Sequence, residues 1–597
     1  MWKVSQRHLA HFPLLELLQK LPHTGNFPVE VVGSELCDDL LQRLGPSLAR
    51  HRSCDIIDIN PGAGVWSAKV HDYVKPRRHI LVQPQAKRYL PFLKPLLDAP
   101  ESRYSLVDCT GGKAWRLDEY VKQNFMTMRE GVEEDVPETK KSNDTLLVLA
   151  NLGMILRRSK GRAVDQRRGF RRIEEFFAAA REHAGFHGHG SIRMLVWMVD
   201  DVKSSLLPRT VAHRLKPAVE AEMNAHVEEI AGGKEDSEAA RESSIELASA
   251  NIVAQRMGER GLSIPVARRS ELQQEAQDNM AREHVYSSSA NLNLAAERRV
   301  PTPDWHEELL DLEAKFKAGE LKEFMEDAEY DKIPYHVAHP SIRKNHPQRT
   351  PQSKRLRKLQ DKRSRLESLE GVINELRREQ AALDQLDLAI ANGEYEGAAH
   401  TAKLEEWQRR TAQCMERVHM QSTLFDAKAE DIYDDDRRAF ARPSPLLMWD
   451  HRTAEPLIAN PDEFYPHQTL ALLDIQPKSH VSPLLSSPKH AKTIDAILRR
   501  VFRSRAKPIA EAMATLGPGA DEYLVPAVPA LADIRVGGCR NLERMRCRMV
   551  TVEMVEALAL AWEQWPFKVP LTEFDFLSRW GDNLADVDGL ASNCERH

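Results

Sequence analysis

The chain has 597 residues, several times the length of an ordinary domain, so we expect two or three folded units joined by connecting segments. Its net charge of −5 excludes a uniformly basic molecule, and any surface for nucleic acid must therefore be a local patch. Mean hydropathy is −0.50, and no uncharged apolar run approaches the roughly 18 residues that cross a membrane, which excludes a membrane-spanning helix.

Residues 1–24 form the first predicted element. Lys3, Arg7 and His8 precede the first acidic residue, Glu16, and apolar residues recur at helical spacing. This pattern is compatible either with a mitochondrial targeting helix or with an ordinary first amphipathic helix of the folded protein.

Between residues 54 and 200, short apolar runs alternate with helical patterns. The predicted strands cover 54–59, 79–83, 104–108, 145–151 and 191–199, and the predicted helices cover 66–74, 86–97, 115–123 and 166–183. Nearly continuous apolar strands that alternate with helices predict an open, doubly wound α/β sheet within 25–230. A further helical segment is expected at 209–230.

Residues 231–440 are polar and charge-rich, and we interpret them as a helical insertion. Apolar residues spaced three or four apart within 351–420 predict a long amphipathic helix that can fold back as a hairpin. The insertion is either a surface feature or a coiled coil for a partner protein. Residues 441–480 return to the α/β domain with a strand within 463–477, and 481–597 are predicted to form a small helical domain.

The stretch "DIIDINPGAGVWSAKV" (55–70) joins the first strand to its helix through Gly62 and Gly64. Glycines allow a close backbone approach and the helix N-terminus offers amide groups, so this turn has the features of a nucleotide-binding site. Gln83 ends the second strand, where a carboxylate would hold the two hydroxyls of a ribose. A neutral amide there forgoes about 1–2 kcal/mol of charge-assisted hydrogen bonding.

Three basic clusters are candidates for phosphate binding. Segment 157–172 has seven arginines and one lysine against the single acid Asp165, and it follows the fourth strand, at the sheet edge where ligands bind in this architecture. Its candidate residues are Arg157, Arg158, Arg167, Arg168, Arg171 and Arg172. The second cluster comprises Arg499, Arg500, Arg503, Arg505 and Lys507, and the third comprises Arg540, Arg544, Arg546 and Arg548. A solvated loop is the competing interpretation of the first cluster, and structural salt bridges that of the other two.

Metal and disulfide chemistry have little support. The seven cysteines lack C-x-x-C spacing, which argues against a disulfide framework or zinc module and favours a reducing compartment. His187 and His189 in "GFHGHG" are better explained by a turn between a helix and a strand than by a metal site.

Several motifs together resemble those of one family. They are "GNFPVEVVGSELCDDLLQRLG" (25–45), "DINPGAG" (58–64), "VDCTGGKAW" (107–115), "LLVLANL" (146–152), "EFYPHQTLALLDIQP" (463–477) and "ILRRVFRSRAKPIAEAMATLG" (497–517). In order and spacing they resemble the rRNA adenine N6-dimethyltransferase family, and within it the fungal mitochondrial transcription factor B branch, in which "MWDHRTAEPL" (448–457) also has a counterpart. The resemblance covers about 25–220 and 445–530.

The resemblance implies a class I S-adenosylmethionine-dependent methyltransferase fold with a particular cofactor site. Asp58, Gly62 and Gly64 would line the methionine end of S-adenosylmethionine, Gln83 the ribose, and Asp108 the adenine amino group. Asn151 would head the family's Asn-Leu-Pro-Tyr motif, which holds the amino group of a flipped adenine and stacks a ring on it. This chain has Asn151-Leu152-Gly153-Met154 instead, without the ring and the proline. Losing the ring costs roughly 1–3 kcal/mol of base binding, so catalysis by Asn151 is in doubt.

Three functions follow from the resemblance. The first is a transcription initiation factor of the mitochondrial matrix that helps a mitochondrial RNA polymerase to recognise and melt promoter DNA, with segment 157–172 and the basic helix near 499–507 holding the separated strand. The second is an active S-adenosylmethionine-dependent dimethyltransferase of small-subunit rRNA. The third is a ribosome-associated structural or assembly protein that uses the fold only to bind rRNA.

Overall fold

The computed structural model describes residues 12, 14–21, 27–108, 142–158, 161–164, 166–182, 185–234, 241–281, 303–325, 349–421, 427–478, 482, 484 and 487–568. The chain divides into two compact units, one of Met1–Asn291 with Ile432–His597 and one of Leu292–Asp431. The second unit is shorter at both ends than the insertion predicted at 231–440. Helices α9 (Ser243–Glu259) and α10 (Glu271–Ala281) pack against each other and belong to the first unit.

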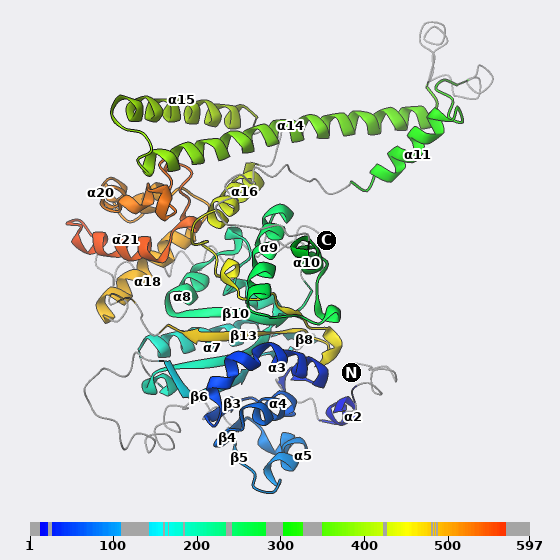
Figure 1. Ribbon diagram of the computed structural model, residues 1–597, viewed down its shortest axis with the longest axis vertical. Coiled ribbons are helices and arrows are strands. Elements are labelled where there is room, and N and C mark those ends of the chain that lie inside the picture. Colours follow the sequence, from blue (N-terminus) through cyan, green and yellow to red (C-terminus); the bar gives the residue numbers. More distant parts are fainter. Residues whose placement is uncertain are drawn as a thin grey trace. The chain divides into compact units, whose positions relative to one another are not determined.

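An eight-stranded sheet forms the centre of the first unit (Figure 1). Its strands are β3 (Asp55–Ile59), β4 (Arg78–Gln83), β5 (Tyr104–Asp108), β6 (Ser142–Asn151), β9 (Ser191–Val199), β10 (Ala225–Gly232), β11 (Leu457–Ile458) and β13 (Leu470–Pro477). Their order across the sheet is β11-β10-β13-β9-β6-β3-β4-β5. Neighbouring strands from β5 to β9 are parallel, and β13 runs antiparallel to both of its neighbours.

The direction of winding reverses between β3 and β6. From β3 the chain adds β4 and β5 on one side, then crosses back to place β6 and β9 on the other. Helices α4 (Val65–Val74) and α5 (Ala86–Leu97) make the first two crossovers, and α7 (Gln166–Arg181) makes the one from β6 to β9. A reversal of this kind opens a crevice at the carboxyl ends of the strands, which is where such sheets bind ligands.

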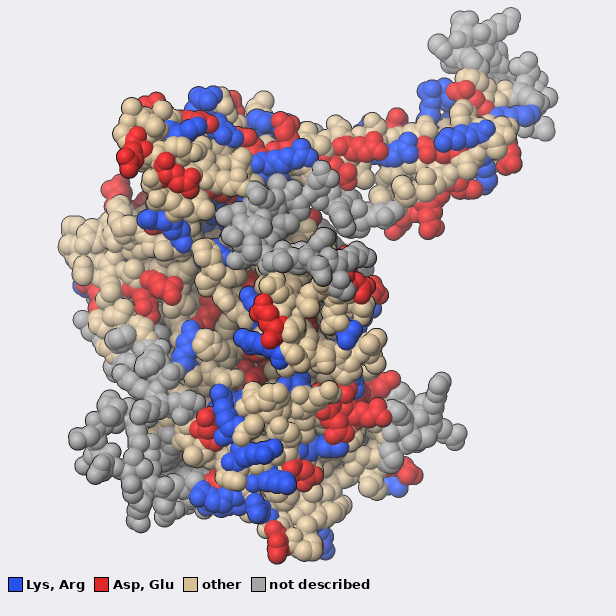
Figure 2. Space-filling view, in the orientation of Figure 1, with Lys and Arg blue, Asp and Glu red and all other residues tan. Residues whose placement is uncertain are grey.

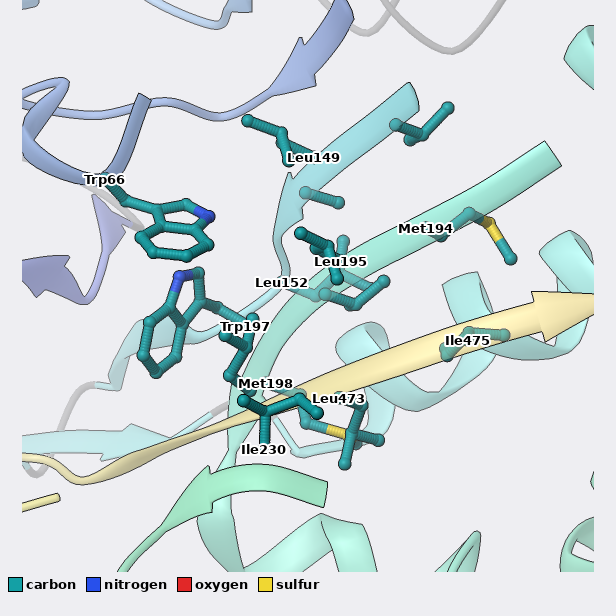
Figure 3. Close-up of a cluster of buried hydrophobic side chains, with 14 of the residues drawn as sticks. Trp66, Leu149, Leu152, Met194, Leu195, Trp197, Met198, Ile230, Leu473 and Ile475 are labelled. Atoms are coloured by element: carbon teal, nitrogen blue, oxygen red, sulfur yellow. The ribbon is translucent and has the colours of Figure 1, made fainter. Parts of the chain in front are cut away.

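The core of the α/β part lies between the central strands and the helices (Figure 3). Trp66 on α4 meets Trp197 on β9 edge to face, with ring centroids 6.0 Å apart. Around them pack buried side chains from three strands, including Leu149, Leu195 and Leu473. Because these strands are buried on both faces, their sequences are almost continuously apolar.

Most predicted elements of this region are confirmed. Strands β3, β4, β5, β6 and β9 and helices α4, α5 and α7 lie where they were expected, and β13 completes the sheet from within 463–477. The helix predicted at 115–123 lies outside the described residues. The helix predicted at 209–230 is wrong at both ends. Residues 209–215 contain only a short 3-10 helix (Val211–His213), and α8 (Lys216–Asn224) ends where β10 begins. Pairing of β10 with β13 overrides the helical pattern there.

The C-terminal helices share this unit but have a core of their own. They are α18 (Pro488–Arg503), α19 (Ile509–Ala514), α20 (Ala520–Ala527) and α21 (Val552–Gln564). Trp562 and Trp565 are buried in that core together with Trp449. Arg214, which precedes α8, donates hydrogen bonds to the carbonyl oxygens of Arg548 and Val550 at 2.9 and 2.8 Å, so the helices are tied to the α/β part.

The second unit contains the predicted helical hairpin. Helix α14 (Pro351–Ala391) packs against α15 (Gly397–Gln421) through a cluster that includes Leu383 and Trp407. Helix α11 (His306–Lys317) packs on α14, where Arg355 pairs with Glu308 at 2.5 Å. A coiled-coil partner for 351–420 stays a prediction.

At the other end of the chain, α2 (Leu14–Gln19) is a short helix whose Leu15 and Leu18 are buried with Val32 and Tyr465. The earlier part of the predicted segment 1–24 lies outside the described residues. In the part of the chain that the structure describes, no helix has the length and apolar character to cross a membrane.

Candidate functional site

The glycine turn lies at the carboxyl end of β3, in the middle of the sheet, as the sequence predicts. Gly62 and Gly64 both have positive φ, +60° and +78°, and α4 begins at the next residue, Val65. A Cβ atom at position 62 would overlap the carboxylate of Glu30, so the turn needs glycine there for space as well as for conformation.

The amide groups of this turn already donate to the protein's own side chains. Gly62 N donates to Gln83 Oε1 at 2.9 Å, and Ala63 N donates to Glu30 Oε2 at 2.8 Å. Glu30 lies on the short strand β2 (Glu30–Val31), which pairs with β12 (Phe464–Tyr465). The two donors that would face a bound nucleotide are therefore occupied by an amide and a carboxylate from within the chain.

Glu30 is a buried acid with an unusual proton affinity. Its side chain is 4% exposed, and burial raises its pKa to about 7. The hydrogen bond from Ala63, the Tyr89 hydroxyl and the charge of Arg88 oppose that rise only in part. No feature of the sequence singled out Glu30, because an isolated acid between apolar residues gives no signal of the turn that it contacts.

Both polar atoms of the Gln83 side chain make hydrogen bonds within the protein. It is 1% exposed, and its Nε2 donates to Pro84 O at 2.9 Å while its Oε1 accepts from Gly62. It thus connects the ends of β3 and β4 instead of facing outward toward a ribose.

Asp58 points into the layer between the sheet and α4. Its Oδ2 lies 3.4 Å from His79 Nε2, and His79 Nδ1 lies 3.1 Å from His71 Nδ1. Tyr104 stacks on both imidazoles. Burial, with the neighbouring charges of His79 and Arg103, lowers the pKa of His71 to about 4. This group of side chains ties α4 to three strands.

Asn151 ends β6 and is held by the polypeptide that crosses above it. Its Nδ2 donates to Val29 O at 2.7 Å, and its Oδ1 accepts from Gly153 N at 3.1 Å. Val29 N in turn donates to Gly153 O, continuing the pairing of β1 (Phe27–Pro28) with β7 (Met154–Arg158). A Cβ atom at Gly153 would collide with Leu470. Asn151, which the family resemblance would assign to a flipped adenine, is therefore engaged by Val29 and Gly153, and Leu470 lies against Gly153. We call this arrangement the closed Asn151 position.

These contacts test whether the chain fits S-adenosylmethionine, and it does not. The turn amides, the Gln83 side chain and the Asn151 side chain are all engaged in hydrogen bonds within the protein. Asp108, at the end of β5, is exposed at the same edge of the sheet. The structure brings Gly62 and Gln83 to the same edge of the sheet, where the sequence placed both, and joins them by a direct hydrogen bond that the sequence did not predict.

Segment 157–172 lies next to this edge. It covers the ends of β7, the strand β8 (Gly161–Val164) and the start of α7, and β7 and β8 form an antiparallel ribbon. The side chains of Arg157, Arg158, Arg167 and Arg168 lie outside the described residues. Arg171 is exposed, and Arg172 pairs with Glu175.

The two C-terminal clusters differ from each other. In the first, Arg503 and Arg505 are exposed at and just beyond the end of α18, whereas Arg499 pairs with Asp495 and Arg500 bonds to Thr515. In the second, Arg544 pairs with Asp434 at 2.9 Å, and Arg546 and Arg548 pair with Asp435 at 3.0 and 2.7 Å. These three arginines therefore form structural salt bridges, which was the alternative to phosphate binding for this cluster.

A further basic surface was missed from the sequence. Figure 2 shows Lys and Arg side chains gathered over α4 and β4. Arg52, Lys75, Arg77 and Arg103 are exposed at the amino ends of β3, β4 and β5, and Arg77 pairs with the buried Asp55 at 2.7 Å. These residues precede different strands, and only the parallel register brings them together.

Histidines and cysteines add no site within the described residues. His187 lies in a short 3-10 helix, Gly185–His189, between α7 and β9, as expected for a turn. No group of three or more His, Cys, Asp or Glu side chains there is placed to hold a metal ion. Cys37, Cys54, Cys414, Cys539 and Cys547 are buried thiols that are not joined in disulfides.

Comparison with known proteins assigns no family to this chain, so a conclusion about its function rests on the fold and the site. No family model matches the chain, and no curated protein matches its sequence. What the structure defines is an α/β protein with a mostly parallel, Rossmann-like sheet, whose central glycine turn is filled by its own side chains.

Proposed function

We propose that this protein is a mitochondrial transcription initiation factor of the transcription factor B kind, built on an rRNA adenine dimethyltransferase fold that no longer catalyses methyl transfer. The observation that carries the proposal is the filled glycine turn, in which Gly62 N and Ala63 N donate to Gln83 and Glu30. An enzyme that must bind and release a cofactor at each turnover needs those donors free, whereas a scaffold gains stability by satisfying them.

The order of strands supports the fold assignment within this proposal. The direction in which strands are added reverses between β3 and β6. Strand β13 lies between β9 and β10 and runs antiparallel to both. A mostly parallel sheet of this kind is compatible with the class I methyltransferase fold that the family resemblance implies.

The closed Asn151 position supports the loss of catalysis from the side of the substrate. Methyl transfer requires the target amine in line with the methyl group, and small displacements are costly. Here Asn151 holds Val29 and Gly153, and no proline or aromatic ring follows it. Asn151 would thus keep the edge of the sheet in shape for a function other than chemistry.

Binding of nucleic acid would use the positive charges near this edge. Segment 157–172 begins within β7, whose first residue, Met154, closely follows Asn151, and Arg503 and Arg505 are exposed at and just beyond the end of α18. Each phosphate that such residues neutralise releases counterions, so affinity would depend strongly on salt. The separated strand of a melted promoter presents these phosphates together with unpaired bases.

The test is a reconstituted transcription assay with a mitochondrial RNA polymerase. We expect promoter-specific transcripts from a linear duplex only when the full chain is added, and equal transcription with and without it on a template melted in advance. Promoter transcripts that do not depend on the chain would contradict the proposal. Methylation of adjacent adenines in small-subunit rRNA would replace it with the enzyme, and stable co-sedimentation with the small ribosomal subunit without any effect on transcription would replace it with the assembly protein.

A further inference from the structure

A pocket of about 450 Å³ opens at the carboxyl ends of β9 and β10, further along the same sheet edge from the glycine turn. Its volume is in the range of pockets that hold small-molecule ligands. It is lined by the segments that follow β9, β10 and β11 and by the one that precedes β13. The residues used below are Asp200, Lys203, Leu207, Lys234, Ile458, Pro461 and Gln468.

The pocket is next to the closed Asn151 position. Leu152 N donates to Trp197 O at 2.7 Å. Trp197 lies near the end of β9, and Asp200 is the first residue after that strand. Leu470, which fills the space beside Gly153, comes directly after the pocket residue Thr469. A strand that runs along this edge would therefore pass the closed position and reach the pocket.

The buried charges in the wall of the pocket cancel. Lys203 Nζ lies 2.7 Å from both Asp200 Oδ1 and Glu229 Oε1, and Arg209 pairs with Glu229 at 3.2 Å. Burial alone would raise the pKa of Glu229, but Lys203 and Arg209 hold it below its usual value. The network pairs two basic with two acidic side chains, so their formal charges balance. A neutral wall favours an uncharged polar ligand over a phosphate in the interior of the pocket.

The remaining groups offer both polar and apolar contacts to a heterocyclic ligand. Both hydrogen bonds to the Asp200 side chain use Oδ1, from Lys203 and from Gly233 N, so Oδ2 is left to accept from a ligand. Gln468 is one of the lining residues, and a glutamine side chain can donate and accept at neighbouring atoms of a base. Leu207, Ile458 and Pro461 contribute apolar surface for the ring, and Lys234 is exposed.

We propose that this pocket binds one unpaired nucleobase whose Watson–Crick edge has an exocyclic amino group beside a ring nitrogen acceptor, adenine or cytosine, with Asp200 Oδ2 accepting from the amino group and Gln468 donating to the adjacent ring nitrogen. Lys234 meets the phosphate of the same nucleotide at the rim. The inference deepens the proposed function, on which it rests for the source of the base, a separated strand. A free mononucleotide has the same chemistry, and the experiment distinguishes the two.

The experiment measures binding of the full chain to fluorescent single-stranded oligonucleotides of one length, whose central position is adenine, cytosine, thymine or an abasic site. We expect the adenine and cytosine strands to bind roughly tenfold more tightly than the abasic strand, and thymine to resemble the abasic strand. Gln468→Ala removes this preference. The matched control Gln408→Ala, at an exposed position on α15, retains it.

A second experiment titrates the full chain with free AMP and measures binding by calorimetry. Saturable binding of AMP that Gln468→Ala abolishes, without a base preference in the strands, would assign the pocket to a free nucleotide. Equal affinity for all four strands together with no AMP binding, or equal behaviour of Gln468→Ala and Gln408→Ala, would overturn the pocket proposal. If the pocket proposal fails but the strands still bind in a salt-dependent manner, the proposed function stands. If no strand binds at any salt concentration, the proposed function is contradicted, and the AMP titration still tests the pocket.

Discussion

At the scale of single residues, Glu30 acts as an internal ligand of the glycine turn. Its carboxylate accepts a hydrogen bond from Ala63 N and occupies the space beside Gly62 that a Cβ atom would need. Because the group is buried, its proton affinity rises, and the stability of the turn becomes linked to pH.

Replacing Glu30 with glutamine tests this linkage. The pKa of Glu30 rises from 4.5 to about 7 on folding, so between these values the folded state keeps a proton that the unfolded state has lost, and stability falls as pH rises. Glutamine has no such proton and can still accept from Ala63. We therefore expect Glu30→Gln to match the wild type near pH 5 and to be more stable by roughly 1–3 kcal/mol near pH 8, measured by thermal unfolding. A difference that does not change with pH would contradict the buried position of Glu30.

Asn151 is predicted to be structural. Asn151→Ala leaves Val29 O without a donor and Gly153 N without an acceptor, which costs about 1–3 kcal/mol at a buried position. Hydrogen exchange should therefore speed up in residues 27–33. The control Asn143→Ala removes the amide that caps Thr145 at a less buried site and should leave exchange at 27–33 unchanged. Unchanged exchange in Asn151→Ala would show that the amide does not hold this segment.

At the scale of elements, an acidic run on α16 (Ala427–Phe440) joins that helix to the C-terminal residues. Asp434 and Asp435 are buried and pair with Arg544, Arg546 and Arg548. Removing one member of a buried ionic network leaves its partners as uncompensated charges, which is more costly than the loss of an exposed pair.

Asp435→Ala should therefore destabilise the C-terminal helices by about 3–5 kcal/mol. Limited proteolysis and thermal unfolding measure the effect. Asp38→Ala removes a carboxylate that pairs with Lys69 at the surface, and we expect it to be close to neutral. Similar small effects of both substitutions would mean that the network around Asp435 does not hold the helices in place.

Elements were predictable where local pattern and final environment agree. The apolar runs of β3, β6 and β9 indicate buried strands because those strands are buried on both faces. Strand β10 has Glu228 and Glu229 in its middle, and the burial of Glu229 is possible only because Lys203 and Arg209 approach from another segment.

Contacts between distant segments also limit what the sequence predicts about the site. Gly62 and Gln83 could be placed at adjacent strand ends, but the contact of Glu30 with the turn depends on a pairing between β2 and β12, which are more than 400 residues apart.

At the scale of the whole molecule, a chain with net charge −5 must present its positive charge locally to bind nucleic acid. The proposed function places that charge on segment 157–172 beside the carboxyl edge and on Arg503 and Arg505. A local patch predicts that a few substitutions change the salt dependence of binding without changing the fold.

Charge reversal at Arg167, Arg168, Arg171 and Arg172 tests this placement. We expect weaker binding to single-stranded DNA and a shallower decrease of affinity between about 50 and 200 mM salt. Reversal at Arg357, Lys358, Lys362 and Arg365 changes the net charge by the same amount on exposed positions of α14, and we expect it to leave the slope nearly unchanged. Equal slopes for both variants would exclude segment 157–172 as the phosphate-binding surface.

The most direct test of the central claim, that the chain has closed its own cofactor site, is calorimetric titration of the full chain with S-adenosylmethionine. The filled turn predicts no saturable heat up to about 1 mM ligand, and no methyl transfer to small-subunit rRNA in the same preparation. Saturable binding in the micromolar range accompanied by methylated adenines would contradict it.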